Sequence, residues 1–152
     1  MTARRLWTTP PERPVAGIVT SPYGFRRFFN GVPRNPHAGA DFRAATGTPI
    51  RAMFAGRVVL TGNHFFAGGS IYIDSGNGVI TEYFHLSEIN VRAGDQVTKG
   101  QVIGLAGATG RVTGPHLHLG LNLAGQHVDP VPLFETSVTQ LLNTMRTAVV
   151  RE

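Results

Sequence analysis

Apolar and polar residues alternate along short stretches of this chain, and turn signals separate the stretches. The clearest alternation is HLHLGLNL at residues 116–123, where leucine occupies every second position. A period of two is typical of a β-strand with one buried face. Similar runs, GGSIYID at 68–74 and VITEYFHLS at 79–87, flank the turn SGNG. From Thr48 onward the pattern therefore predicts short strands joined by tight turns.

The two ends of the chain differ from this strand-rich middle. Residues 1–14 carry three prolines and no clean periodicity, so we expect an extended lead-in. Residues 137–152 (SVTQLLNTMRTAVVRE) repeat apolar positions at helical spacing, with Ser137 as a suitable N-cap, and predict a short C-terminal helix. The expected organisation is one domain over residues 15–136 between these two segments.

Composition supports an all-β, mainly antiparallel fold. The chain has 152 residues, 41% of them hydrophobic, and is rich in glycine (19) and proline (10). This length suits one domain with its own core, and many turns between short strands favour a sandwich or barrel. The absence of cysteine excludes disulfides, thiolate metal sites and cysteine nucleophiles.

Neither a membrane span nor an ordinary signal peptide is expected from the sequence. No run of about 18 apolar residues occurs, which excludes a transmembrane helix by hydropathy. The start, MTARRLW, is basic but has no apolar stretch behind it. If the protein is exported, we expect its targeting segment to lie outside this sequence.

The net charge of +5 favours an anionic partner, such as an acidic polymer, although a soluble domain with surplus arginine explains it equally well. The basic residues are spread along the chain. Their densest pairs, Arg4–Arg5 and Arg26–Arg27, are too small for a nucleic-acid footprint, so we expect no nucleic-acid partner.

Two histidines interrupt the leucine alternation. On a strand, His116 and His118 share one face and stand roughly 6–7 Å apart along it. The leucines share the opposite face, which we expect to be the core: positions 117, 119, 121 and 123. An isolated pair of this kind is more often two exposed histidines than a functional site.

A second pair, His37 and Asp41, changes that balance. In an extended glycine-rich segment an even separation brings both side chains to one side. Zinc accepts imidazole nitrogen and carboxylate oxygen, and a catalytic zinc takes three protein ligands and one water. His37, Asp41 and one member of the 116/118 pair would supply that set. His85 is predicted to share a strand face with Tyr83.

Taken in order, PHAGADF, YFHLS and GATGRVTGPHLHLGL resemble the lysostaphin-type (LytM-like) zinc endopeptidases. The glycine-rich VRAGDQVTKGQVIGLAG and the earlier SPYGFRRF resemble further segments of that family. The resemblance covers about Val15 to Leu133. The sequence departs from the family at HLHLGL, where relatives carry HLHFE. We interpret the leucine at position 119, in place of phenylalanine, as a change in core packing.

The resemblance implies a site residue by residue. His37, Asp41 and His118 correspond to the zinc ligands, and His116 and His85 correspond to the catalytic histidines. The family's fold is compact, antiparallel and grooved, and its substrates are peptide cross-links or stem peptides of bacterial peptidoglycan. Such a substrate implies action in the periplasm or at the cell exterior.

The resemblance predicts a zinc metalloendopeptidase in which zinc-activated water is the nucleophile. No H-E-x-x-H motif supplies a glutamate base. A histidine can take that role near neutral pH. We assign His116 as the general base, and His85 as the residue that orients the water or stabilises the developing oxyanion. We expect specificity to reside in the loops at 28–35 and 62–69.

Three other interpretations compete with this one. A non-catalytic relative would bind cell wall or activate an amidase, but such relatives lose ligands and this chain keeps all of them. A lipoyl- or biotinyl-carrier domain needs a lysine on a tight hairpin, and the only lysine, Lys99, lies in a different context. A cupin needs a glutamate soon after its histidine pair, and residues 120–125 contain none.

Overall fold

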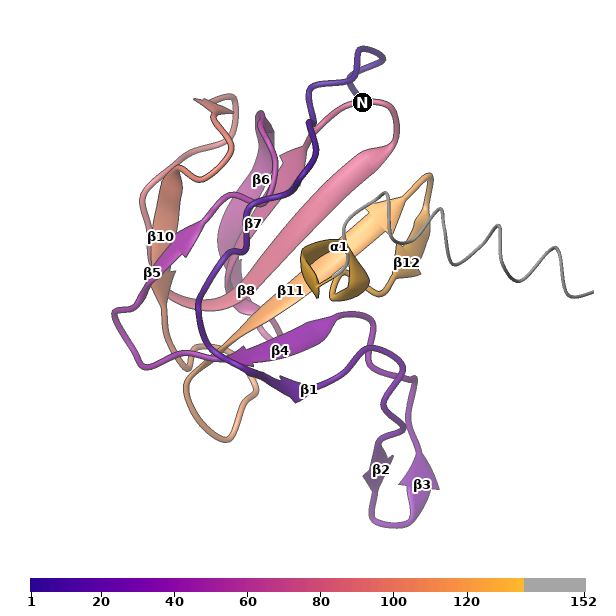
Figure 1. The fold of residues 1–152 in the computed structure, drawn as a ribbon. Helices are drawn as coiled ribbons and strands as arrows, with labels where there is room; N and C mark the ends of the chain where they lie inside the picture. Colours follow the sequence, from indigo (N-terminus) through magenta and orange to yellow (C-terminus); the bar gives the residue numbers. More distant parts are fainter. Residues whose placement is uncertain (136–152) are drawn as a thin grey trace, which may run out of the picture.

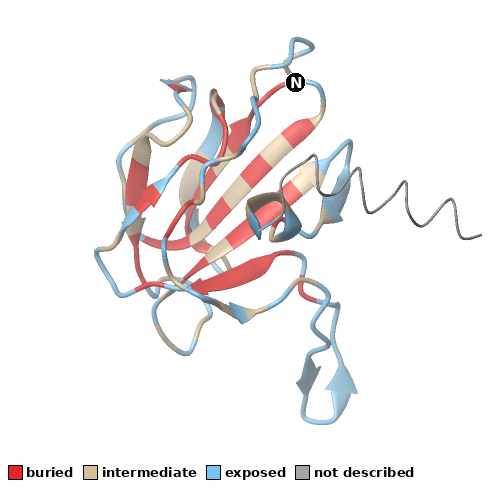
Figure 2. Cartoon of the chain, in the orientation of Figure 1, coloured by how far each residue is buried: buried red, intermediate tan, exposed pale blue. Residues whose placement is uncertain are grey.

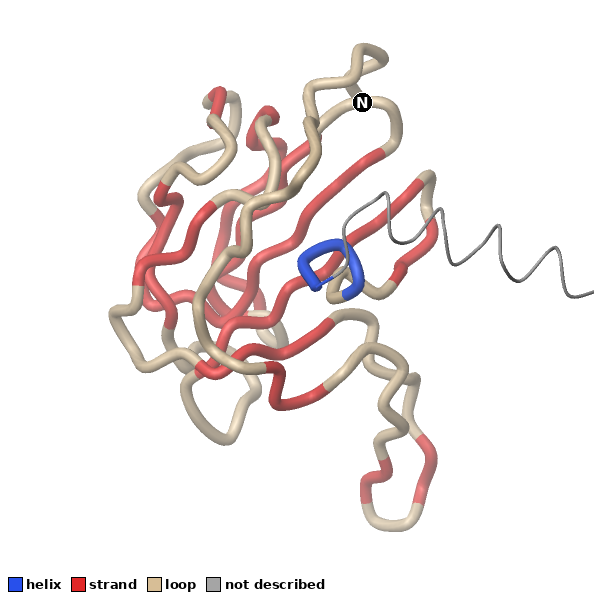
Figure 3. The backbone as a smooth tube through the Cα atoms, viewed as in Figure 1, coloured by secondary structure: helices blue, strands red, loops and turns tan. Residues whose placement is uncertain are grey.

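The computed structural model describes residues 1–135, and its regular structure is almost entirely β-strand (Figures 1 and 3). The helix expected at 137–152 lies outside the described residues. Within them one short helix occurs, α1 (Pro132–Glu135). The strands are β1 (Val19–Ser21), β2 (Phe28–Phe29), β3 (Val32–Pro33), β4 (Ala40–Arg43), β5 (Pro49–Arg51), β6 (Gly56–His64), β7 (Gly68–Asp74), β8 (Val79–Ile89), β9 (Gln96–Val97), β10 (Val102–Ala106), β11 (His116–Leu123) and β12 (Gln126–Val128).

Ten of these strands form one antiparallel sheet, which confirms the predicted fold class. Its main path runs β1-β4-β11-β8-β7-β6-β9, while β10 pairs with β5 and β8, and β12 pairs with β11. The long strand β8 lies at the centre (Figure 1). The hairpin β2–β3 forms a separate two-stranded sheet that projects away from the main one.

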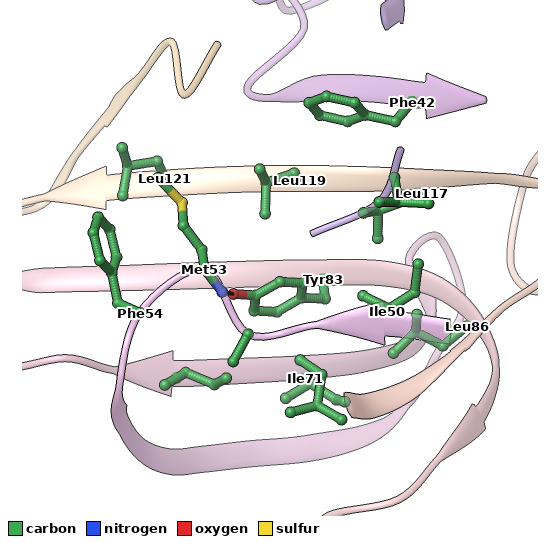
Figure 4. Packing of buried hydrophobic residues seen from close by; sticks show 14 of the residues in the cluster. Phe42, Ile50, Met53, Phe54, Ile71, Tyr83, Leu86, Leu117, Leu119 and Leu121 are labelled. Atoms are coloured by element: carbon green, nitrogen blue, oxygen red, sulfur yellow. Dashed lines mark hydrogen bonds between the residues drawn. The ribbon is translucent and has the colours of Figure 1, made fainter. Parts of the chain in front are cut away.

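Strand alternation divides the central strands into a buried face and a more open face, visible as bands along β8 and β11 in Figure 2. The side chains of Leu117, Leu119 and Leu121 are essentially fully buried, as predicted. Burying each contributes about 1.5–3 kcal/mol. Figure 4 shows them packed with residues from β4, β5, β7 and β8: Phe42, Ile50, Ile71, Tyr83 and Leu86.

The prediction that Leu123 also belongs to the core is wrong, because 40% of this residue is exposed. Leu123 is the last residue of β11 and adjoins the turn at Ala124–Gly125, where the chain reverses into β12. The alternation of side chains continues to the end of β11, but the last core residue of this strand is Leu121.

The prediction that His85 shares a face with Tyr83 is also wrong. In the β7–β8 ladder Ile71 pairs with Tyr83 but Gly69 pairs with Leu86, so β8 carries one extra residue here. This β-bulge includes His85, whose φ of 65° is in the left-handed region. Tyr83 and Leu86 are therefore both in the core, and His85 is directed to the open face with Phe84.

Residues 1–14 contain no helix or strand and run along the domain. The Thr2 amide donates to the Asp74 carboxylate, and the Leu6 amide donates to the Ser75 carbonyl. Among the described residues no helix is both long and apolar enough to cross a membrane.

Candidate metal centre

The sheet register and the loop before β4 bring three predicted ligands together. Asp41 on β4 and His118 on β11 are direct partners in the β4–β11 ladder. His37 lies in the loop before β4, and its amide donates to the Phe25 carbonyl. Asp41 and His118 are 77 residues apart in the sequence, and this single cross-strand pair brings them together.

The three side chains converge on one point. Nε2 of His37 lies 3.0 Å from Oδ1 of Asp41, and Nδ1 of His118 lies 2.9 Å from the same oxygen. The two imidazole nitrogens are 3.0 Å apart. Ligand atoms about 2.0–2.1 Å from a tetrahedral zinc are separated by about 3.3 Å. The three ligand atoms therefore need to move apart by only a few tenths of an ångström to hold the ion.

A backbone carbonyl and two side chains orient His37 and Asp41 from behind. Nδ1 of His37 lies 3.0 Å from the Pro22 carbonyl oxygen and 3.3 Å from the Ser21 hydroxyl. Because a carbonyl only accepts, Nδ1 carries the proton and Nε2 is the nitrogen that can bind a metal. The guanidinium of Arg27 lies 3.5 Å from Oδ2 of Asp41, so the other carboxylate oxygen, Oδ1, remains available to the metal centre.

The protonation states suit metal ligation. Burial by itself raises the pKa of the Asp41 carboxyl, but the facing imidazoles of His118 and His37 outweigh it and hold that pKa well below its ordinary value. Burial lowers the pKa of His118, although Asp41 partly opposes the shift. A carboxylate and a neutral imidazole are the forms that coordinate zinc.

The other two predicted site residues, His85 and His116, lie beside this set. The rings of His85 and His116 have centroids 4.7 Å apart, and Nε2 of His116 lies 3.8 Å from Oδ1 of Asp41. Nδ1 of His85 donates to the Thr109 carbonyl oxygen at 2.9 Å, and Nδ1 of His116 donates to the Gly114 carbonyl oxygen at 2.9 Å. In both rings Nε2 is therefore the nitrogen left for chemistry.

His85 is neutral at ordinary pH. Burial is the main reason why the pKa of His85 falls to about 4, and the neighbouring His116 adds to the effect. With its proton on Nδ1, the neutral ring presents a lone pair at Nε2. This nitrogen accepts a hydrogen bond and has no proton to give to an oxyanion.

One pocket opens directly onto these groups. It is lined by Arg27, Asp41, His85, Arg111, Val112, Thr113, His116 and His118. All five predicted site residues thus lie around one centre. The ligand atoms of His37, Asp41 and His118 converge on it, and His85 and His116 line the pocket that opens onto it.

Sequence reasoning did not identify the residues that support the site. Thr109 and Gly114 contribute through backbone carbonyls, which any residue has, so no side-chain pattern marks them. Arg27 and Arg111 lie in loops, and only the fold brings them to the pocket. For Arg27, the neighbouring GFRRF motif was the available signal.

Comparisons with known proteins agree with this geometry. Peptidase family M23 matches residues 35–130, a span that contains every predicted site residue. The peptidoglycan DD-endopeptidase ShyA of Vibrio cholerae is 50% identical over 94 residues, covering 62% of this chain and 22% of ShyA. The glycyl-glycine endopeptidase ALE-1 of Staphylococcus capitis is 42% identical over 98 residues, covering 63% of this chain and 27% of ALE-1.

A comparison of folds also finds a peptidase. The crystal structure of a zinc-containing peptidase from Vibrio cholerae matches with a TM-score of 0.69 at 34% identity, over 84% of this chain and 38% of that chain. The matched part of this chain covers only about a quarter of the length of the two relatives named above, 22% of ShyA and 27% of ALE-1.

Proposed function

Because the chain belongs to peptidase family M23, we propose that it is a zinc-dependent endopeptidase that hydrolyses peptide bonds in bacterial peptidoglycan. The observation that carries the proposal is the convergence of His37, Asp41 and His118 beside the free Nε2 atoms of two further histidines. The substrate class follows the names of relatives such as ShyA and ALE-1.

His37 Nε2, Asp41 Oδ1 and His118 Nδ1 would hold the zinc. When bound, zinc polarises the scissile carbonyl and lowers the pKa of a coordinated water towards about 7. Three protein ligands leave a position open for that water, as catalytic zinc sites require.

His116 is assigned as the general base. Its Nε2 lies on the centre side of the ring because Nδ1 is bound to the Gly114 carbonyl. Nε2 accepts the proton of the attacking water and afterwards delivers it to the leaving amine.

His85 is assigned to orient the attacking water. Its neutral Nε2 accepts a hydrogen bond from that water, while Thr109 holds the opposite side of the ring. This geometry favours water orientation over oxyanion stabilisation, because stabilising an oxyanion requires a donor.

The competing candidate is a wall-binding or amidase-activating protein without catalysis. The intact ligand set and the two free Nε2 atoms favour the enzyme, since a binding protein has no need of them. The proposed action on peptidoglycan implies a location in the periplasm or at the cell exterior.

Digestion of purified sacculi tests the proposed function. The zinc-loaded protein is incubated with sacculi that contain either direct or glycine-bridged cross-links, with and without 1,10-phenanthroline, and products are identified by mass. We expect one zinc per chain and new peptide termini that disappear with the chelator. Intact sacculi of both kinds, with zinc bound, would favour the non-catalytic candidate.

A further inference from the structure

Next to the metal centre lies a group of arginines and phenylalanines that the proposed mechanism does not use. It consists of Arg27, Arg34 and Arg111 with Phe29 and Phe66, and is called the arginine subsite below. These residues line one pocket together with Phe28 and Asn35. They come from three separate segments: the β2–β3 hairpin with its flanks, the loop before β7, and the loop between β10 and β11.

Aromatic rings contact two of the three guanidinium groups of the subsite. Arg34 and Arg111 lie on the ring of Phe29, each with its guanidinium carbon 5.5 Å from the centroid. Arg111 also lies 6.0 Å from the centroid of Phe66. Such contacts stabilise a cation and orient its plane while leaving its N–H groups free.

The positive charge of the subsite is largely uncompensated. Among residues 1–135, neither Arg34 nor Arg111 forms an ion pair. Arg27 has one partner, Asp41, at 3.5 Å. Within the described part of the chain, Asp41 is also the only acidic residue that lines the pockets containing these arginines. Bringing three cations together without anions is unfavourable unless an anionic ligand joins them.

The subsite is continuous with the metal centre. Arg27 and Arg111 line both the subsite and the pocket that contains His85, His116 and His118. A third pocket joins Arg111 and Phe66 to His37. An anionic group held by Arg111 would therefore lie next to the proposed metal centre.

We propose that the arginine subsite binds a free carboxylate of the peptide substrate and so selects peptides that carry a carboxylate near the scissile bond. An arginine fork matches the two oxygens of a carboxylate. Stem peptides carry such carboxylates, whereas a glycine bridge has no charged side chain. This inference rests on the proposed function and narrows it towards cross-links between stem peptides.

The test compares a purified stem-peptide dimer with the same dimer whose carboxylates have been converted to amides. The variants are Arg111→Gln and the double variant Arg34→Gln/Arg111→Gln. Arg92→Gln is the control for charge, because Arg92 is exposed and lines none of the pockets that contain the subsite arginines. Arg27 is left intact because it contacts Asp41.

We expect the wild type and Arg92→Gln to cleave the acidic dimer at least about tenfold better than the amidated dimer, mainly through KM. Both subsite variants should lose this preference, because their cleavage of the acidic dimer should fall to their own rate on the amidated dimer. Equal cleavage of both dimers by the wild type overturns the inference. So does an equal loss on both dimers in the variants, because that result indicates packing alone.

Binding separates this inference from the proposed function. Calorimetry with His116→Ala, and with His116→Ala combined with the double variant, measures affinity for both dimers without turnover. Tighter binding of the acidic dimer that depends on Arg34 and Arg111 supports the carboxylate subsite, even if neither dimer is cleaved and the proposed function fails. If the two dimers bind equally, or if neither binds, the carboxylate subsite is overturned.

Discussion

At the scale of single residues, the bulge at His85 is the most consequential feature. A non-glycine residue at positive φ costs about 1–2 kcal/mol, and here two hydrogen bonds offset that cost. The His85 amide donates to the Ala67 carbonyl, and its ring donates to the Thr109 carbonyl. Strain held by surrounding contacts is common at functional sites, and this bulge directs His85 to the open face.

Replacing single histidines should separate metal binding from chemistry. We expect His37→Ala to lose both zinc and activity, because it removes a proposed ligand. His85→Ala and His116→Ala should keep one zinc per chain but lower kcat by about 10²–10⁴-fold. Metal analysis by mass spectrometry and peptide hydrolysis measure the two properties on the same samples. Full activity in either of the latter variants would refute its assigned role.

Tyr83 provides a separate prediction about stability. Burial raises its pKa from 10.0 to about 12, so the folded state favours the neutral phenol. That contribution is complete below pH 10 and is lost as the pH rises through about 12. The free energy of unfolding, measured in urea, should therefore fall over this range.

Tyr83→Phe is the matched variant. At neutral pH it should be less stable by about 1–3 kcal/mol, because the buried Met53 amide loses its acceptor (Figure 4). Between pH 10 and 12 its stability should fall less than that of the wild type. An unchanged pH slope in this variant would show that another group causes the alkaline loss.

At the scale of elements, the close approach of β4 and β11 determines where the ligands meet. At Gly39 a Cβ atom would overlap the Leu119 carbonyl oxygen and lie 2.7 Å from Nε2 of His118. Only glycine therefore allows the segment before β4 to lie this close to β11. The position of His118 depends on this contact as much as on its own strand.

Gly39→Ala should displace β11 and weaken the metal centre. We expect a loss of about 1–3 kcal/mol in stability and a lower zinc affinity, measured by competition with a chromogenic chelator. Gly62→Ala is the control, because its Cβ would approach only the exposed ring of His64, at 3.2 Å. Wild-type zinc affinity in Gly39→Ala would mean that the strand pair absorbs the extra methyl group.

At the scale of the whole molecule, the core and the metal centre are separate. The buried cluster on one face of the sheet contains none of the proposed ligands. Small zinc modules depend on the metal to fold, but a domain with its own core does not. The metal should therefore add stability to a fold that already exists.

Metal removal tests that independence. After chelation the far-ultraviolet circular dichroism at 25 °C should remain that of the folded protein. Free zinc at about 100 times its Kd should then raise Tm by about 5–10 °C, since only the folded state offers the assembled site. In His118→Ala the rise should disappear. An unfolded apo-protein at 25 °C would contradict a metal-independent core.

The sequence alone determined the strand-rich class, the buried leucines of β11 and the five candidate site residues. Alternation and family motifs are local signals, and local signals suffice for these features. The sequence could not place His85, because one extra residue in β8 inverts the face that alternation predicts. It also missed the end of the core at Leu123, where burial depends on what covers a strand.

Only the tertiary structure decided how the site is built. The β4–β11 register brings Asp41 opposite His118, and backbone carbonyls of Thr109 and Gly114 determine which nitrogen is free in His85 and His116, the two histidines proposed to be catalytic. The same fold gathers arginines from distant loops into one subsite. The physical reason is that a residue's type sets its chemistry, while its partners and burial come from segments far away in the chain.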